Sequence, residues 1–324
     1  MITRFFLVLL LSIGTVTAGN NELTARQALM KMTQAMAVLN FQGTVAFFKN
    51  GRLETMKYFH AAAKGVQQER LLSLNSPLRE IVRDANKVSC LFKATQQLVV
   101  DHRPFGRSFL VDVPENLDAL SAVYDFKRAG EEDVAMLPAY VIVVQPVDDF
   151  RYGRKIWLDQ QHFLPLKVEL YDLSGATLEQ VVFTELQVTG ALPFVDVEFA
   201  QGARASGSVQ HIHQLQPQSS EQASFIVSSL PPGFRDLFFT RRPMHNSKQP
   251  VEHLLLSDGF ASVSVYVENN LQPGFRSDDS IHQIGAVNFF TRAVDGSLIT
   301  VMGEVPAKTV KFIAEGIKLR HSNE

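Results

Sequence analysis

Residues 41–60 read FQGTVAFF (Phe41–Phe48), KNG (Lys49–Gly51) and RLETMKYFH (Arg52–His60), and they carry the clearest structural signal in the chain. Apolar and polar residues alternate on both sides of the central KNG, which is the period-two pattern of half-buried strands. Asn-Gly supplies the two positive φ angles that a tight hairpin turn requires. The stretch therefore predicts two antiparallel strands joined by a two-residue turn.

A helix is predicted just before this hairpin. The sequence Thr24-Ala-Arg-Gln27 fits a capping box, in which the Thr24 hydroxyl accepts from the Gln27 amide and the Gln27 side chain reaches back. Apolar residues then recur at helical spacing, which predicts an amphipathic helix that ends near Asn40. Those residues are Leu29, Met32, Met36 and Leu39.

Short strand-like runs, each closed by turn residues, continue from the hairpin to residue 188. A short helix over Glu115–Val123 interrupts them. The density of the runs predicts a large, mostly antiparallel sheet that curls on itself, with the first helix over its open side. The runs are Val66–Leu74, Leu78–Arg83, Lys87–Phe92, Gln96–Asp101, Val134–Gln145, Lys155–Asp159, Leu166–Asp172 and Leu178–Val188.

The composition changes near residue 200. Residues 201–222 are rich in Gln, Ser, Gly and Ala, which is typical of a linker. Beyond this linker, strand-like runs return, and Asp295-Gly296 predicts another hairpin. Pro306 suits the start of a helix whose apolar stripe consists of Val310, Ile313, Ala314 and Ile317. We therefore predict an α+β fold, with a domain over 19–200, the linker 201–222 and a smaller sheet-and-helix domain over 223–324. The later runs are Val251–Leu256, Phe260–Val267, Ala286–Thr291 and Leu298–Gly303.

The composition excludes several classes of protein. The 324 residues carry 31 Lys and Arg against 33 Asp and Glu, so nucleic-acid binding through a broadly basic surface is not expected. Cys90 is the only cysteine, which excludes a disulfide within the chain and a cysteine-based zinc site. Its place in a strand-like run favours an inert, buried thiol.

The first 18 residues have the pattern of a secretory leader. Arg4 precedes the apolar run Phe5–Ile13, which is shorter than the about 20 residues that span a bilayer. Small residues follow, so we predict cleavage between Ala18 and Gly19; the alternatives are a buried first strand or an uncleaved anchor. An exported chain without disulfides fits a bacterial periplasm.

The sequence carries none of the common motifs of catalysis considered below. The chain has no G-x-S-x-G, no P-loop, no G-x-G-x-x-G after a strand and no H-E-x-x-H. The pair His211 and His213 has metal-ligand spacing, but it lies in the predicted linker without a carboxylate or cysteine partner. We interpret Glu131–Asp133 and Asp148–Gly153 as charged turns, and the basic residues Arg241, Arg242, His245 and Lys248 as an exposed loop rather than a site for an anionic ligand. We therefore predict no enzyme activity, metal or cofactor.

Several short stretches of sequence indicate a relationship to a known protein family. In order along the chain, they resemble the RseB/MucB family of regulators over most of residues 24–320. The strings are Asn40–Thr44, Gly51–Met56, Glu69–Leu74, Leu78–Arg83, Asp149–Gly153, Trp157–Asp159, Leu164–Lys167, His253–Val267, Gly285–Asn288 and Gly303–Pro306. The sequence departs from the family's pattern at Ala135–Pro138, at Asn269–Asp279 and in the Gln/Ser-rich linker.

The resemblance implies a periplasmic negative regulator of the envelope-stress sigma factor sigma-E (AlgU in alginate-producing relatives). Such a regulator binds the periplasmic segment of a membrane anti-sigma factor of the RseA/MucA type and shields it from proteolysis until lipid or lipopolysaccharide binds. It also implies an N-terminal unclosed β-barrel like those of the carriers LolA and LolB. The resemblance is also compatible with a homo-oligomer.

An apolar concave face could accept acyl chains, and one strand face of the first hairpin is the candidate lining. Phe41, Val45 and Phe47 share that face by period two, and Trp157 is added from a later strand. The alternative is that these residues pack under the first helix as ordinary core. A second function also stays open, that of a soluble lipid or lipoprotein carrier like LolA, although a carrier would need only the first domain.

Overall fold

The structure is a computed structural model that describes residues 23–85, 87–102, 108–196, 209–212, 217–242, 250–269 and 279–320. The predicted leader with its Ala18–Gly19 junction lies outside these residues, as do His213, His245 and Lys248. None of the described helices has the length and apolar character needed to cross a membrane.

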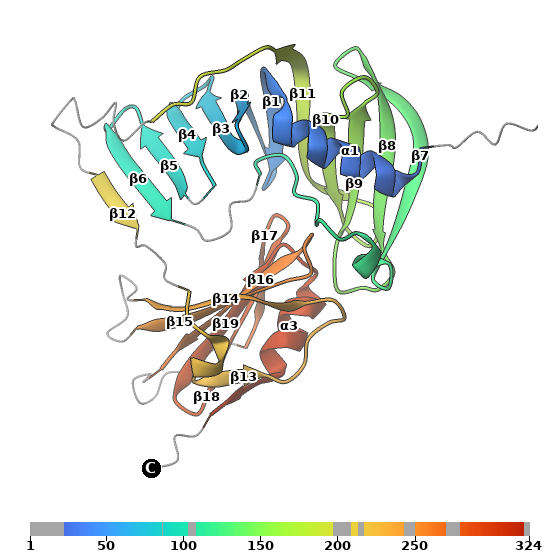
Figure 1. Cartoon of the computed structure of the whole chain (residues 1–324). Helices are drawn as coiled ribbons and strands as arrows, with labels where there is room; N and C mark the ends of the chain where they lie inside the picture. Colours follow the sequence, from blue (N-terminus) through green and yellow to red (C-terminus); the bar gives the residue numbers. More distant parts are fainter. Residues whose placement is uncertain are drawn as a thin grey trace, which may run out of the picture.

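Twelve strands form one curled sheet in the N-terminal part of the chain. Every neighbouring pair is antiparallel except β12 and β6, which are parallel. The end strands β12 and β7 do not pair with each other, so the curl is unclosed, as predicted (Figure 1). In sheet order the strands are β12 (Val209–Ile212), β6 (Gln97–His102), β5 (Lys87–Phe92), β4 (Arg79–Arg83), β3 (Val66–Ser73), β2 (Arg52–Ala63), β1 (Asn40–Lys49), β11 (Thr177–Thr189), β10 (Pro165–Tyr171), β9 (Gly153–Asp159), β8 (Leu137–Pro146) and β7 (Tyr124–Val134).

Helix α1 (Ala25–Val38) lies inside the curl and contacts strands of both halves of the sheet (Figure 1). Its capping box is present, because Gln27 N donates to Thr24 Oγ1 at 3.2 Å and Thr24 N donates to Gln27 Oε1 at 2.9 Å. The predicted hairpin is also confirmed: Asn50 and Gly51 have φ angles of 54° and 70° between β1 and β2. The main hydrophobic core therefore fills the space between α1 and the concave face of the sheet.

The C-terminal part forms a six-stranded antiparallel sheet with helix α3 (Ala307–Glu315) against β18 and β19, which confirms the predicted sheet and helix. It lies on the open side of the curl (Figure 1). In sheet order its strands are β14 (Arg235–Arg242), β15 (Val251–Ser257), β16 (Ser262–Glu268), β19 (Ser297–Gly303), β18 (Val287–Val294) and β17 (Ile281–Ile284). A separate antiparallel pair joins β13 (Phe225–Val227) to β20 (Ile317–Leu319).

The structure differs from the sequence prediction in several elements. Residues 124–134 form β7, and Glu131–Asp133 lie in this strand rather than in a turn. The short helix predicted over 115–123 is reduced to a 3₁₀ turn, η1 (Asp118–Leu120). The predicted linker 201–222 contains β12, which extends the large sheet, and a second 3₁₀ turn, η2 (Ser220–Gln222). Ile317 belongs to β20, beyond the end of α3.

Candidate functional site

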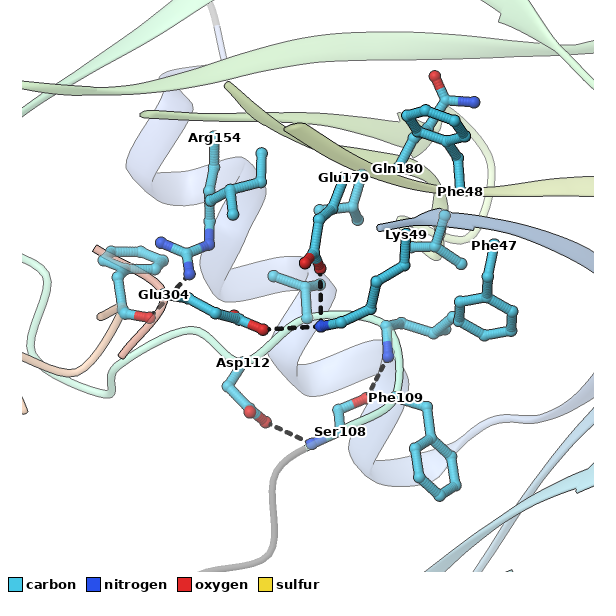
Figure 2. Close-up of a pocket in the computed structure, with 16 residues that line it drawn as sticks. Phe47, Phe48, Lys49, Ser108, Phe109, Asp112, Arg154, Glu179, Gln180 and Glu304 are labelled. Atoms are coloured by element: carbon cyan, nitrogen blue, oxygen red, sulfur yellow. Dashed lines mark hydrogen bonds and ion pairs between the residues drawn. The ribbon is translucent and has the colours of Figure 1, made fainter. Parts of the chain in front are cut away.

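Two neighbouring cavities open on the side of the large sheet that α1 covers. One has a volume of about 390 Å³ and the other about 630 Å³, and both are lined by Phe47, Lys49 and Phe109. The smaller one also reaches Phe260 and Glu304 of the C-terminal sheet domain. Figure 2 shows Phe47 and Phe109 on one side of this smaller cavity and Arg154 and Glu304 on the other, with Lys49 between them.

The walls of the larger cavity combine an apolar floor with a charged rim. Met56, Leu71 and Ile81 join the shared phenylalanines on the floor. At the rim Arg79 Nη2 donates to Glu54 Oε2 at 2.6 Å, with both side chains partly exposed. The arrangement suits an amphiphile that buries a hydrocarbon chain and keeps a polar end in water.

A buried carboxylate positions the chain segment that separates the two cavities. Glu69, which is 0% exposed, accepts from Ser108 Oγ at 2.5 Å and from Phe109 N at 2.9 Å. It also accepts from Tyr58 Oη at 2.8 Å and from Arg83 Nε at 2.7 Å. Burial and the Glu69 carboxylate raise the pKa of the Tyr58 hydroxyl well above its usual value, so Tyr58 stays a donor. These contacts fix Phe109 between the cavities.

Lys49 connects the cavity wall to the C-terminal domain. Its ammonium donates to Glu179 Oε2 at 2.9 Å and to Glu304 Oε1 at 2.8 Å. Burial lowers the pKa of Lys49, but the two carboxylates outweigh it and the net direction is upward. Burial also raises the pKa of Glu179, against the opposing effect of Lys49. The ammonium is therefore held charged between one carboxylate of each domain.

The junction between the domains is centred on Arg151, which is fully buried. Its Nη2 donates to the Pro232 carbonyl at 2.6 Å, and its Nη1 lies 3.5 Å from Asp258 Oδ2. Tyr124 Oη donates to the same Asp258 oxygen at 2.8 Å, and the Tyr124 ring packs edge-on against Phe260 at 5.2 Å. Phe260 thus joins the core of the first domain from the second.

Polar contacts continue the junction along the loop before β9. Lys308 Nζ lies 2.5 Å from Asp149 Oδ2, and Thr309 Oγ1 donates to the Phe150 carbonyl at 2.6 Å. Asn288 Nδ2 donates to Tyr152 Oη at 3.0 Å. The segment 148–153, predicted to be a charged turn, thus also contacts the second domain.

The four candidate lining residues do not all lie at the cavities. Phe47 is half-buried and lines both. Phe41 and Val45 are 0% exposed and belong to the core that includes the buried face of α1. Trp157 packs in a different cluster with Val141, and its Nε1 donates to Glu132 Oε2 at 2.7 Å. Lys49 and Phe109 were not predicted as lining residues, although period two places Lys49 on the same strand face as Phe47.

The other polar groups singled out in the sequence have structural partners or lie apart from the cavities. Arg241 lies in β14 and its Nε lies 2.7 Å from Glu252 Oε1, so it belongs to a strand and not to a loop. His211 lies in β12. Within the described ranges, no group of three or more His, Cys, Asp or Glu residues has an arrangement that could hold a metal ion. Cys90 is half-buried rather than buried as predicted, and this partial burial raises the pKa of its thiol, which disfavours the reactive thiolate.

Comparison with known proteins extends over both domains. The MucB/RseB N-terminal domain family matches residues 24–218, and the MucB/RseB C-terminal domain family matches residues 219–318. The sigma factor AlgU regulatory protein MucB of Pseudomonas aeruginosa is 30% identical over 320 residues, which covers 96% of each chain. The sigma-E factor regulatory protein RseB of Escherichia coli K12 is 28% identical over 291 residues, covering 90% of this chain and 89% of RseB.

Solved structures show the same relationship. MucB in the Pseudomonas aeruginosa MucA/MucB complex superimposes with a TM-score of 0.71 at 28% identity, covering 92% of this chain and 99% of MucB. A crystal structure of MucB gives a TM-score of 0.60, again at 28% identity, with 91% of this chain and 98% of that one covered. With both of its domains matched, the chain belongs to the MucB/RseB family.

Proposed function

We propose that this protein is a periplasmic negative regulator of an envelope-stress sigma factor. It binds the periplasmic segment of a membrane anti-sigma factor and shields that segment from regulated proteolysis. The observation that carries the proposal is the TM-score of 0.71 with MucB from a MucA/MucB complex, over 92% of this chain. The relatives named as sigma factor regulatory proteins, which match across both domains, support the same assignment.

Release of the segment follows when a lipid, such as lipopolysaccharide, enters the concave face. The two adjoining cavities of about 390 and 630 Å³ and their apolar floor support this part of the proposal. Each methylene buried there would contribute about 0.8 kcal/mol, so even one acyl chain supplies appreciable binding free energy. The chain acts in this proposal as a binding protein rather than an enzyme, and the predicted leader directs it to the periplasm.

The proposed regulatory function is tested by measuring binding between two purified components by calorimetry. The mature chain is titrated with the periplasmic segment of the anti-sigma factor encoded in the same genome, and saturable binding is expected. The bound segment should also be cleaved more slowly by an added protease than the free segment. Failure of the two to associate would contradict the proposal.

The cavities also fit the second candidate, a soluble lipid or lipoprotein carrier. A carrier should extract an acylated protein or lipid from vesicles into a soluble complex without any anti-sigma segment. The buried contacts of Arg151 with Pro232 and Asp258 count against it, because a carrier has no need of a tightly joined second domain. Vesicle extraction therefore distinguishes the two candidates.

A further inference from the structure

One strand face runs from the core, past the cavities, to the second domain. Val45, Phe47 and Lys49 are successive residues on one face of β1, since side chains alternate along a strand. Val45 is buried in the core, Phe47 lines both cavities, and Lys49 bonds Glu304 of the C-terminal domain. The same strand face therefore connects the cavity-lining Phe47 to the strand end that holds Lys49.

The ionic contact at this strand end is more than an isolated surface pair. The Glu179 side chain is 16% exposed, and its Oε1 is buried without a hydrogen-bond partner in the structure. The Lys49 ammonium pairs with this carboxylate and with Glu304, and the Ala286 backbone is a further hydrogen-bond partner of Glu179. Networks of this kind hold geometry better than single exposed ion pairs.

The tip of the β1–β2 hairpin touches the second domain at another point. Gly285, in the turn between β17 and β18, has a φ of 60°, and a Cβ added there would lie 1.9 Å from Asn50 Oδ1. The neighbouring Ile284 lines the larger cavity. The hairpin tip is thus both cavity wall and domain contact.

We propose that the β1–β2 hairpin, acting through the Lys49–Glu304 contact, couples acyl-chain occupancy of the cavities to the position of the C-terminal domain. A chain that enters beside Phe47 moves the hairpin tip, and Lys49 then leaves Glu304. The inference rests on the proposed lipid function and adds the residues that transmit it. By linkage, the domain arrangement that keeps this contact binds the acyl chain more weakly.

The junction supplies a matched control. Lys308 and Asp149 also form an ion pair between the domains, with partly exposed side chains, yet neither residue lines a described cavity. Loss of this pair weakens the junction without touching the cavity wall. Glu304→Gln and Lys308→Gln each remove one charge from one interdomain pair and differ in their distance from the cavities.

The test measures the distance between the domains in the mature chain. Spin labels are attached at Lys127→Cys in β7 and Lys311→Cys in α3, in a Cys90→Ser background, so that neither label lines a described cavity. The probe is dansyl-labelled undecanoic acid, whose emission reports binding, and pulsed electron resonance reports the label-to-label distance. We expect the probe to shift this distance in the parent and in Lys308→Gln.

In Glu304→Gln, the label-to-label distance without probe should already overlap the distance that the parent shows with probe bound. The probe should also bind about fivefold more tightly than to the parent, because no Lys49–Glu304 contact has to be broken. An unchanged probe response in Glu304→Gln, or an equal loss of response in Lys308→Gln, overturns the inference and leaves the proposed function standing. If the parent binds the probe without a change in the label-to-label distance, the inference is overturned and the proposed function still stands. A parent whose dansyl emission does not respond refutes the lipid function as well.

Discussion

Arg151 and Asp258 form an ion pair in which both side chains are 0% exposed, with Nη1 and Oδ2 3.5 Å apart across the domain junction. The Arg151 guanidinium also lies over the rings of Tyr124 and Phe234, at 5.3 Å from each centroid. Arg151 Nε and Nη1 have no hydrogen-bond acceptor in the structure. Two carboxylates lie beside the guanidinium: Asp148 Oδ1 at 3.4 Å from Nε in the first domain, and Asp258 Oδ2 from the second.

Asp258→Ala should lower the free energy of unfolding by about 3–5 kcal/mol, because it removes one of the two carboxylates beside the buried Arg151 charge and the acceptor of Tyr124 Oη, Phe260 N and Ala261 N. Urea denaturation followed by circular dichroism measures the change. Tyr124→Phe is the control: it removes one donor to Asp258 and should cost about 1.5–3 kcal/mol. Equal losses in the two variants would show that the ion pair adds nothing to the hydrogen bond.

Glu69→Gln should lower the free energy of unfolding by about 2–3 kcal/mol, because the side chain keeps its shape but loses the charge that faces Arg83. The comparison is Glu54→Gln, whose side chain is 40% exposed and paired with Arg79. There the expected loss is below about 1 kcal/mol. Thermal or urea unfolding of both variants gives the result, and the prediction fails if the two match.

Phe47→Asp should preserve the fold and weaken binding of the dansyl fatty acid about tenfold or more, because it places a carboxylate in the apolar lining of both cavities. Phe41→Asp, on the same strand face but 0% exposed, should instead unfold the domain. Circular dichroism and probe titration together separate these outcomes. If Phe47→Asp also unfolds, Phe47 is core rather than lining.

The stability of the protein should depend on the pH through Glu179, whose pKa is raised by burial above the ordinary 4.5. A carboxyl group with a raised folded pKa binds more protons in the folded state than in the unfolded state. The contribution of Glu179 to the free energy of unfolding therefore falls as the pH rises from about 4.5 through the folded pKa, and it is constant above that pKa. The free energy of unfolding of the parent, relative to Glu179→Gln, should decline over this range in urea titrations. A flat difference would contradict the assignment.

Local signals in the sequence predict the local structure well. The Thr24–Gln27 capping box, the Asn50-Gly51 turn and the helix that follows Pro306 each depend on contacts within a few residues. The curled sheet follows from the density of such strands and turns. These elements could be predicted because residues close in sequence specify them.

Elements that depend on distant partners were harder to predict. Strand β7 is an edge strand with an exposed, charged second half, so Glu131–Asp133 carry no alternation that would indicate a strand. Arg151 and Lys49 look like surface cations in the sequence, and only the folded chain brings Asp258 and Glu304 to them. Conversely, the alternation of Phe41 and Val45 predicts a buried strand face correctly, but it does not show where the core ends and the cavity begins.

The unclosed curl leaves β7 with one partner, β8, among the strands that the structure describes. Unpaired strand edges invite edge-to-edge aggregation, and proteins blunt them with charged side chains. Exposed Asp125, Lys127 and Glu131–Asp133 supply such charges along β7. The barrel can thus stay open for an apolar guest while its β7 rim repels the backbone of a second copy, and self-association by that route is disfavoured.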